Sequence, residues 1–393
     1  MDTNTNPTAT HTPPSSDTLL AWWRLRNIKG VGSIALSDVR QFLNNDPGQL
    51  SACNTDDLLT AGLSANACDQ FLNDDALSEG FDDAMQWCKQ PGQGLLLAGC
   101  SPYPEALASL RDAPTLLWYR GNLTALQRPM IAIVGSRGAT PAALEWARDT
   151  AAVLAARGIT VVSGLALGID GAAHTGAVSV RHGQTIAVMG TGADIIYPAR
   201  HRPLAGDITT HGLLLTEFAP GTKAQARHFP SRNRIISGLS LATLVVEAGI
   251  QSGTMITARM AADHGRDVLA VPGALANPLS RGPHQLIREG ALLVENGQQV
   301  LEALQLDAPV SHQPSLFSDS FNESFNESFN EQKSNHPPAD IPKIASLVDF
   351  SPTPVDVIAL RAASPISELL PELLQLELDG WLAQVPGGYS RLR

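Results

Sequence analysis

The spacing of apolar residues predicts a sheet in the middle of the chain. Short runs rich in Val, Ile and Leu alternate there with helical stretches, which is typical of a parallel sheet covered by helices on both faces. The runs occupy residues 130–134, 159–162, 185–189, 213–215, 243–246, 268–271 and 291–294. We therefore predict a doubly wound, mainly parallel α/β domain over residues 101–305.

The N-terminal part of the chain has a helical pattern. Residues 1–16 are polar and Pro-rich, so we expect them to be disordered. From Thr18 onward, two apolar helical faces flank Gly30-Val31-Gly32, which predicts a helix-hairpin-helix (SAM-like) domain over residues 17–100. The glycines of such a hairpin either admit a phosphate to the backbone amides or only let two helices pack closely, and both interpretations stay open.

The C-terminal part begins with a low-complexity segment. Residues 306–340 contain the tetrapeptide SFNE three times in tandem, which predicts a linker. Its phenylalanines recur every four residues, so a weak docking stripe on a helix is an alternative to simple repeat expansion. From residue 341 to 393 the pattern is helix, helix, helix and hairpin, which predicts a winged helix.

The third helix of this winged helix is acidic. The sequence ISELLPELLQLELD carries four carboxylates and no basic residue, where a DNA-reading helix needs positive charge. We therefore expect this helix to contact protein rather than DNA. Pro371 falls within it and predicts a kinked first turn.

Net charge is unevenly distributed along the chain. The formal charge of −11 taken alone argues against nucleic acid, because phosphate binding depends on Lys and Arg. However, residues 101–294 hold 17 basic and 12 acidic side chains, whereas residues 1–100 hold 5 and 12, and residues 295–393 hold 5 and 14. The predicted sheet domain is therefore basic between two acidic flanks, as an anionic ligand requires.

The remaining composition narrows the class of protein. The chain has no apolar run long enough to span a bilayer and a polar start, so we expect a cytoplasmic protein without membrane contact. The four cysteines have neither CxxC spacing nor a nearby His, so we expect no disulfide and no metal. Neither a GxGxxG after the first run nor a GxxxxGK[ST] is present, so we expect no nucleotide cofactor.

Glycine-rich loops follow five of the apolar runs. In an open parallel sheet ligands bind beyond the carboxyl ends of the strands, so these loops are expected to meet at one edge. Glycine permits close approach of the backbone, and amides at helix N-termini carry partial positive charge, so this edge suits phosphate. The loop residues expected at the site are Gly135, Ser136, Arg137, Ser163, Gly164, Gly168, Gly190, Gly192, Ser252, Gly253 and Thr254.

A stretch without carboxylates adds basic and aromatic side chains. Residues 218–246 contain no Asp or Glu, and Phe229 within them is either a base-stacking surface beside a basic groove or part of the core. The supporting residues expected at the site are Arg200, Lys223, Arg227, Phe229, Arg232, Asn233 and Arg234.

Ser163, Asp170 and His174 raise the alternative of a hydrolase. The three lie close together in the sequence, and a Ser-His-acid set is typical of nucleophilic catalysis, but the GxSxG elbow is absent. Asp170 and His174 lie one turn apart at the start of a predicted helix, where Asp170 is expected to cap. We therefore favour a hydrogen-bond network that braces the loops, and we expect no catalysis.

Eight segments in this order resemble the DprA/Smf family. They are IAIVGSRGATP, VVSGLALGIDGAAHTGAV, TIAVMGTGADIIYPARH, LLTEFAPG, HFPSRNRIISGLS, LVVEAGIQSGTMITARMA, DVLAVPG and NPLSRGPHQLIREGA. The resemblance covers residues 103–294, and the C-terminal LLQLELDGWLAQVPGG resembles members with a winged helix.

The resemblance implies an extended Rossmann-like fold and a homodimer. It also implies that the protein binds and protects single-stranded DNA in a basic pocket and loads the RecA recombinase onto it, during natural transformation and homologous recombination. Arg137 is then the main DNA contact, supported by Arg200, Phe229, Arg232 and Arg234. Members often have Lys near the YP segment, where this chain has Arg200 and Arg202.

Two other functions stay open. The fold also resembles nucleotide hydrolases of the lysine-decarboxylase-like group, whose PGGxGTxxE loop carries a catalytic glutamate. Here the corresponding loop, residues 247–254, is followed by Met255-Ile256-Thr257, so that glutamate is missing. The second alternative is a protein-interaction scaffold that uses the winged helix and the Phe-rich linker.

Overall fold

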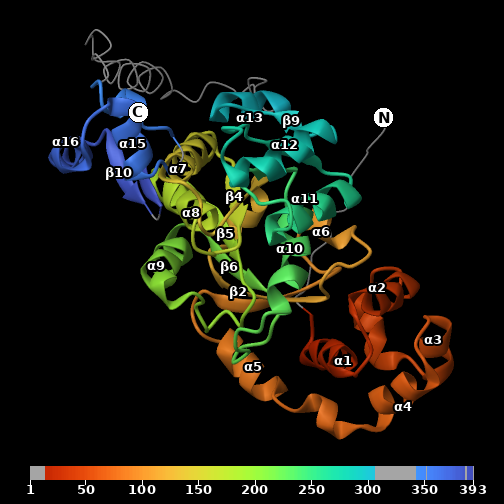
Figure 1. The fold of residues 1–393 in the computed structure, drawn as a ribbon. Coiled ribbons are helices and arrows are strands. Elements are labelled where there is room, and N and C mark those ends of the chain that lie inside the picture. Colours follow the sequence, from red (N-terminus) through yellow and green to blue (C-terminus); the bar gives the residue numbers. More distant parts are fainter. Residues whose placement is uncertain (1–13, 306–341, 351, 386, 393) are drawn as a thin grey trace, which may run out of the picture.

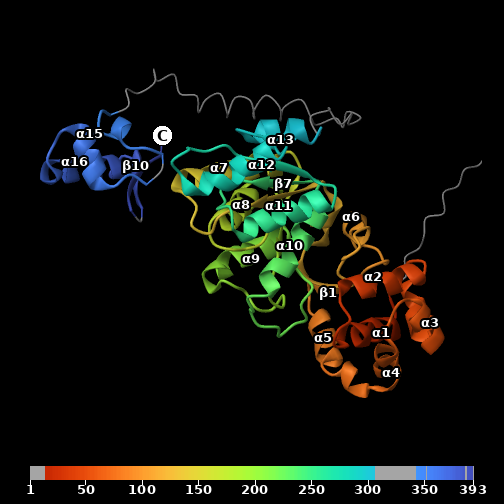
Figure 2. The same ribbon diagram turned by 45° about the vertical axis from the view of Figure 1, so that its right-hand side comes forward.

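A computed structural model describes residues 14–305, 342–350, 352–385 and 387–392. The expected linker, with its SFNE repeat, lies outside the described residues. In two views the N-terminal helical region and the winged helix lie at opposite ends of a central sheet domain (Figures 1 and 2). Within the described residues, no helix is long and apolar enough to cross a membrane.

The central domain is built on one sheet of nine strands. Their order is β1-β2-β6-β5-β4-β3-β7-β8-β9, in which β1, β2 and β6 pair antiparallel and all other neighbours pair parallel. The strands are β1 Gln93–Leu97, β2 Leu116–Gly121, β3 Met130–Val134, β4 Thr160–Ser163, β5 Thr185–Val188, β6 Leu213–Thr216, β7 Ala242–Val245, β8 Asp267–Ala270 and β9 Leu292–Leu293.

The strand order confirms the predicted fold class. From β5 to β9 it follows the doubly wound Rossmann arrangement, and its direction reverses between β3 and β7. The seven predicted runs form β3 to β9, whereas β1 and β2 are additional antiparallel strands. Because β1 pairs with β2, we propose that the helical domain ends before Gln93 rather than at residue 100.

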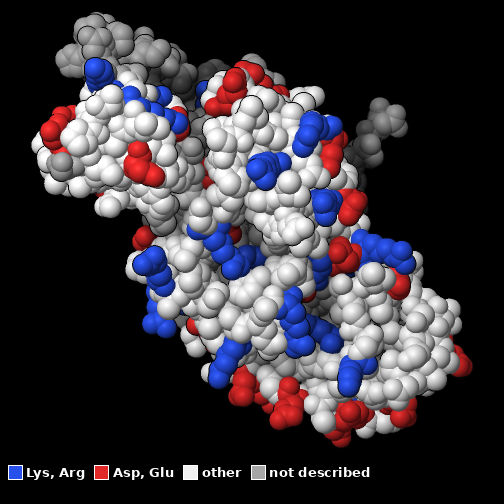
Figure 3. All heavy atoms as spheres, in the orientation of Figure 1, with Lys and Arg blue, Asp and Glu red and all other residues white. Residues whose placement is uncertain are grey.

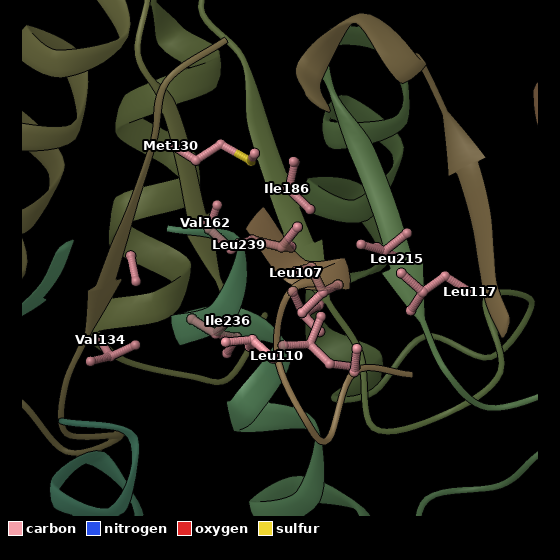
Figure 4. Close-up of a cluster of buried hydrophobic side chains, with 14 of the residues drawn as sticks. Leu107, Leu110, Leu117, Met130, Val134, Val162, Ile186, Leu215, Ile236 and Leu239 are labelled. Atoms are coloured by element: carbon pink, nitrogen blue, oxygen red, sulfur yellow. The ribbon is translucent and has the colours of Figure 1, made fainter. Parts of the chain in front are cut away.

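Helices cover both faces of the sheet. Leu107 of α6, Ile236 of α10 and Met255 of α11 pack on one face, and Leu154 of α7 and Ala173 of α8 pack on the other. Figure 4 shows the first of these layers, where α10 and the segment after α6 meet the strands. The helices are α6 Glu105–Ala108, α7 Pro141–Ala156, α8 Ile169–Ser179, α9 Arg202–His211, α10 His228–Leu239, α11 Gly253–Asp263, α12 Arg281–Arg288 and α13 Gly297–Ala303.

The N-terminal helices form a second core that reaches the sheet. Trp23 of α1 lies edge-on to Phe81 of α5 and to Trp118 of β2, with ring centroids 5.9 and 6.0 Å apart. The predicted hairpin glycine Gly30 has φ +94° and follows the first helix. The helices are α1 Ser16–Asn27, α2 Ser33–Phe42, α3 Thr55–Thr60, α4 Ala65–Asn73 and α5 Phe81–Cys88.

The C-terminal region has the order of elements predicted for a winged helix. Its core joins Ile358, Leu373 and Tyr389, among other buried side chains. The elements are the 3-10 turn Ala345–Leu347, α15 Val355–Ala362, α16 Ile366–Leu378, β10 Leu382–Val385 and β11 Gly388–Arg391. Pro371 lies inside α16, which is assigned as one helix on both sides of it.

Candidate nucleic-acid interface

A cavity of about 750 Å³ lies at the carboxyl edge of the parallel strands. It is open beside the point where the strand order reverses, since the loops after β3 and β7 both line it. Nine predicted site residues line the cavity: Gly135, Ser136, Arg137, Phe229, Arg232, Asn233, Ser252, Gly253 and Thr254. The start of α11 contributes Gly253, so helix N-terminal amides lie at the cavity wall.

Arg137 and two aromatic rings form one continuous surface. The Cζ atom of Arg137 lies 5.9 Å from the ring centroid of Phe229. The ring centroids of Tyr197 and Phe229 are 5.4 Å apart. Tyr197 is 50% exposed and Arg137 is exposed. Phe229 is half-buried. An arginine beside accessible rings provides both a phosphate partner and a stacking surface for a base.

Tyr197 was not among the predicted site residues. It follows the glycine-rich loop after β5, and only the fold brings it to Phe229, the second residue of α10 and 32 residues later in the sequence. Its place next to a glycine-rich strand end was a signal that sequence reasoning left unused.

Glycines hold the loop of Arg137 close to α8. At Gly168, φ is +80°, and a Cβ atom there would lie 2.2 Å from the Ser136 carbonyl oxygen. The amide of Ile169 donates to that same oxygen at 3.2 Å. Gly168 therefore lies behind the cavity rather than in its lining, and it positions the loop.

The other predicted glycines also support the wall. A Cβ atom at Gly164 would lie 2.2 Å from Arg232 Nη2, and one at Gly190 would lie 3.1 Å from the Phe229 ring. Gly192 donates its amide hydrogen to the Thr222 carbonyl at 2.9 Å, which ties the loop after β5 to the segment before α10. These glycines permit close packing behind the cavity surface.

Arg232 is a buried cation at the floor of the cavity. Its guanidinium donates to the carbonyls of Gly164 and Val188 and to the Asn233 side chain. Burial lowers the pKa of Arg232 to about 10, although the nearby Asp170 carboxylate opposes this shift. Arg232 therefore stays charged at neutral pH and adds positive potential to the cavity.

Asp170 is the one carboxylate among the described residues that line the cavity. Its Oδ2 accepts from the amides of Gly164 at 3.2 Å and Ala166 at 3.3 Å, so it fixes the loop between β4 and α8. Burial raises its pKa, and the charge of Arg232 counters this effect. The pair of Asp170 and Arg232 leaves Arg137 as the exposed charge of the cavity.

Arg234 lies away from the cavity. Its guanidinium forms two hydrogen bonds with the Glu217 carboxylate, at 2.8 and 2.7 Å, and donates to the Asp112 carbonyl at 3.0 Å. Its side chain is 9% exposed. This pairing favours a structural role, and a direct contact of Arg234 with DNA stays a prediction.

Three other predicted basic residues are exposed but do not line the cavity. They are Arg200, Lys223 and Arg227, in the segments that precede α9 and α10. In Figure 3, Lys and Arg atoms gather around the hollowed middle of the molecule, whereas many Asp and Glu atoms lie toward its two ends. This distribution agrees with the basic middle and acidic flanks of the sequence.

The Ser163, Asp170 and His174 set is a bracing network. Ser163 Oγ donates to the Ile133 carbonyl at 2.6 Å, and His174 Nδ1 lies 2.7 Å from Thr185 Oγ1. Burial lowers the pKa of His174 to about 3. Ser163 and His174 therefore have other partners, and both are fully buried.

Glu247, in the loop after β7, also has a structural role. Glu247 accepts from the Thr140 amide at 2.8 Å, from the Thr140 hydroxyl at 3.0 Å and from the Asn277 side-chain amide at 2.7 Å. It holds Thr140, the N-cap residue of α7, and does not line the cavity.

Comparison with known proteins places the chain in a family. The sequence model described as DNA recombination-mediator protein A matches residues 95–305, and that of the DprA winged helix domain matches residues 330–388. The chain is 41% identical over 340 residues to protein Smf of Escherichia coli (strain K12), covering 86% of this chain and 87% of that protein. The chain belongs to the DprA/Smf family.

Further members of the DprA/Smf family resemble the chain in sequence and in fold. It is 45% identical over 201 residues to DNA processing protein DprA of Streptococcus pneumoniae, covering 51% of this chain and 70% of that protein. An X-ray structure of DprA from that species gives a TM-score of 0.59 at 33% identity, over 74% of this chain and 98% of the other.

One of the family's solved structures concerns DNA directly. The structure of DNA processing protein A from Helicobacter pylori, described for its unique single-stranded DNA binding mode, gives a TM-score of 0.50 at 29% identity. It covers 55% of this chain and 96% of the other. These comparisons confirm the predicted family and, with the sheet topology, the fold class.

Proposed function

We propose that the cavity binds single-stranded DNA, with Arg137 as its main phosphate partner. The observation that carries this proposal is the joined surface of Arg137, Phe229 and Tyr197 at a wall of backbone amides. The single-stranded DNA binding of the Helicobacter pylori relative supports it. Stacking on rings and charge along a backbone hold single strands without sequence preference.

The binding site includes the predicted residues outside the cavity as supporting groups. Arg200, Lys223 and Arg227 are exposed on neighbouring segments, and we propose that they extend the DNA path beyond the cavity. Arg232 contributes positive potential from beneath the surface. Gly168, Gly190 and Gly192 act by shaping the wall.

A salt series with two charge-reversal variants tests the DNA site. We expect the full-length protein to bind a labelled single-stranded oligonucleotide more tightly than the same sequence as a duplex, with affinity that falls as salt rises. Arg137→Glu is expected to weaken binding at least tenfold, or about 1.4 kcal/mol. It should also reduce the slope of log affinity against log salt by about 1 or more, since a phosphate contact is lost.

Arg181→Glu is the matched control. Arg181 is exposed and lies between α8 and the start of β5, at the sheet edge opposite the cavity. The same change in charge there should leave affinity within about twofold, because exposed charges beyond a Debye length of about 8 Å are screened. Equal loss in both variants would show a nonspecific charge effect, and unchanged binding by Arg137→Glu would remove the cavity as the site.

We further propose that the protein protects this DNA and loads RecA onto it in the cytoplasm, during natural transformation and homologous recombination. Membership of the DprA/Smf family supports this step. The test is RecA ATP hydrolysis on single-stranded DNA at limiting RecA, with and without the protein. We expect acceleration by the wild type and little by Arg137→Glu; no acceleration by either would contradict the loading role while leaving DNA binding intact.

A homodimer through the sheet edge is part of the proposal. The β1 edge packs against α5, whereas β9 ends the sheet with Leu292 and Leu293 at 50% and 48% exposure. Apolar side chains on an open edge strand favour pairing with a second copy. Light scattering should give a dimer for the wild type and a monomer for Leu293→Glu.

We propose that the protein is not an enzyme. The missing glutamate after Thr254 and the structural use of Glu247 both disfavour a nucleotide hydrolase. Release of base or phosphate from nucleoside monophosphates by the purified protein would contradict this conclusion. A function as a scaffold alone would appear as an absence of DNA binding at every salt concentration.

A further inference from the structure

A second cavity, of about 180 Å³, lies at the same edge of the sheet as the cavity that Arg137 lines. It is lined by Thr140, Trp146, Glu247, Pro272, Asn277 and Ser280, among others. These residues belong to the start of α7 and to the segments after β7 and β8. Thr140 is two residues beyond Gly138, which lines the Arg137 cavity, and two residues of chain span at most about 7 Å. The two cavities are therefore neighbours.

Buried polar groups line part of the second cavity. Glu247 and Asn277 are each 7% exposed, and Ser280 is 1% exposed. Within the described residues the Ser280 hydroxyl has no hydrogen-bond partner. Among those residues Glu247 Oε2 accepts one hydrogen bond, from the Thr140 amide, although a carboxylate oxygen can accept two. An acceptor and a hydroxyl are thus available to a ligand at a place where unmade hydrogen bonds are costly.

Rings form much of the remaining lining. The Trp146 ring is half-buried, and its Nε1 donates to the Glu295 carbonyl at 2.9 Å, which holds the ring in place. Phe350, which follows the 3-10 turn of the winged helix, also lines the cavity, and the Cζ atom of Arg391 lies 4.1 Å from its ring centroid. Aromatic rings that are held in this way suit a flat ligand.

The charge and size of the second cavity select the class of ligand. Among the described residues no Lys, Arg or His lines it, and Glu247 adds negative charge, so a phosphate is disfavoured. Its volume of about 180 Å³ is below the roughly 300–1,000 Å³ of pockets for drug-sized ligands, so it suits one small ring system. A carboxylate accepts from N–H donors such as the amino group of cytosine. The lining therefore fits a flat heteroaromatic ring that carries N–H donors.

We propose that the second cavity binds one base of the single strand whose backbone the Arg137 cavity holds. This inference rests on the DNA site proposed above. Cytosine donates from its N4 amino group to Glu247 and packs against Trp146 and Phe350. Thymine carries the O4 carbonyl in place of that amino group, so an acceptor would face the carboxylate. One position of a path that otherwise holds any sequence thus prefers cytosine to thymine.

Two pyrimidine homopolymers test this preference. Labelled oligo(dC) and oligo(dT) of about 12 nucleotides have a length in the range that single-strand sites cover. Fluorescence anisotropy with the full-length protein, at slightly alkaline pH where cytosine is neutral, should show about tenfold tighter binding of oligo(dC), as one charge-assisted hydrogen bond provides. Equal affinities, both lost in Arg137→Glu, would overturn the base site and leave the proposed function intact. Binding of neither would contradict the proposed function and this inference with it.

Ala142→Phe fills the second cavity and leaves the Arg137 cavity open. Of the two cavities Ala142 lines only the second, and it lies in the first turn of α7. The variant should lower the affinity for oligo(dC) about tenfold, to that of oligo(dT), and leave oligo(dT) binding within about twofold. Ala156→Phe, at the last residue of α7 and about 21 Å further along it, is the matched control and should change neither affinity. A cytosine preference that survives in Ala142→Phe would refute the proposal.

Phe350→Ala separates a wall of the cavity from an occupant. If the ring is a wall, its removal should reduce the preference for oligo(dC), because the base loses a packing surface. A rise in oligo(dC) affinity instead would show that Phe350 itself fills the cavity, which contradicts the proposal. Thermal unfolding of each variant checks that it is folded.

A free nucleoside presents the same ring as a base in the strand. Cytidine at the same concentration of bases should displace neither oligonucleotide, because only the strand is also held at Arg137. Displacement of oligo(dC) by cytidine at that concentration would assign the second cavity to a free nucleoside and overturn the assignment to the strand.

Discussion

Replacing Gly168 with Ala should displace or destabilise the loop that carries Arg137. At φ +80° and ψ −133°, a side chain costs about 1–3 kcal/mol of backbone strain. The new Cβ atom would also lie 2.2 Å from the Ser136 carbonyl oxygen and 2.8 Å from Arg137 Cα. Both neighbours are backbone atoms, so a rotation of a side chain cannot relieve the overlap.

Two measurements together detect both responses to this overlap. If the loop holds its place, the unfolding free energy should fall by about 3 kcal/mol, which lowers the thermal midpoint by about 6–12 °C. If the loop moves away instead, Arg137 moves with it, and the affinity for single-stranded DNA should fall about tenfold. Thermal unfolding and oligonucleotide binding by the same preparation therefore cover both cases.

Two glycines with free space provide the controls. A Cβ atom at Gly138, in the same loop, meets nothing within 4 Å, and the same holds for Gly206 in α9. Gly138→Ala should leave the thermal midpoint unchanged or slightly raised, since the unfolded chain loses freedom. Gly206→Ala should leave DNA binding unchanged. A Gly168→Ala protein with wild-type stability and wild-type affinity would refute this account of how the loop is held.

Three further predictions concern single side chains. Glu217→Gln removes the carboxylate charge that pairs with the buried Arg234 guanidinium. Urea unfolding should therefore show a free energy of unfolding about 3 kcal/mol lower, and a loss below about 0.5 kcal/mol would contradict the pairing. Tyr197→Ala should weaken binding to single-stranded DNA by about 1 kcal/mol while Tyr197→Phe does not, and equal affinities would remove the stacking role. Burial lowers the pKa of His174 to about 3, below its unfolded value near 6.5. The neutral imidazole therefore makes its full contribution to the free energy of unfolding above pH 6.5. That contribution declines as pH falls toward 3, by about 1.4 kcal/mol per pH unit. His174→Gln should flatten that decline between pH 6.5 and 5 in urea unfolding, and parallel curves for the two proteins would contradict it.

Strands β3 to β7, which the sequence predicted, are buried on both faces. A run such as residues 130–134 is apolar throughout because helices cover both sides of the parallel sheet. The antiparallel strands β1 and β2 were missed. Each contains a short apolar run, at residues 95–98 and 116–119, but these runs precede the alternation of strands and helices from which the sheet was predicted. Their place in the sheet is set by pairing with each other and with β6, which is a long-range contact.

The sequence could predict those cavity residues that lie in loops directly after parallel strands, because the topology of the sheet alone brings these loops together. Loops after parallel strands meet at one edge, which located Arg137 and the loop of Ser252 without further information. The direction of side chains on α10 was harder to predict, because Pro230 lies where the helix begins. Arg232 and Arg234 are two positions apart and so point to different sides of α10, one to the cavity and one to Glu217.

The negative net charge of the chain does not prevent a positive potential at the cavity, because electrostatic interactions between exposed charges are screened over a short distance. At physiological ionic strength the Debye length is about 8 Å, and α16 lies at the far end of the molecule from the N-terminal helices (Figure 1). The carboxylates at either end therefore contribute little to the potential at the cavity, where Arg137 and Arg232 face one carboxylate, Asp170. The same carboxylates repel a phosphate backbone from the ends of the molecule. The acidic flanks therefore disfavour anions at the two ends of the molecule and leave the basic middle as the part of the described surface that suits a phosphate backbone.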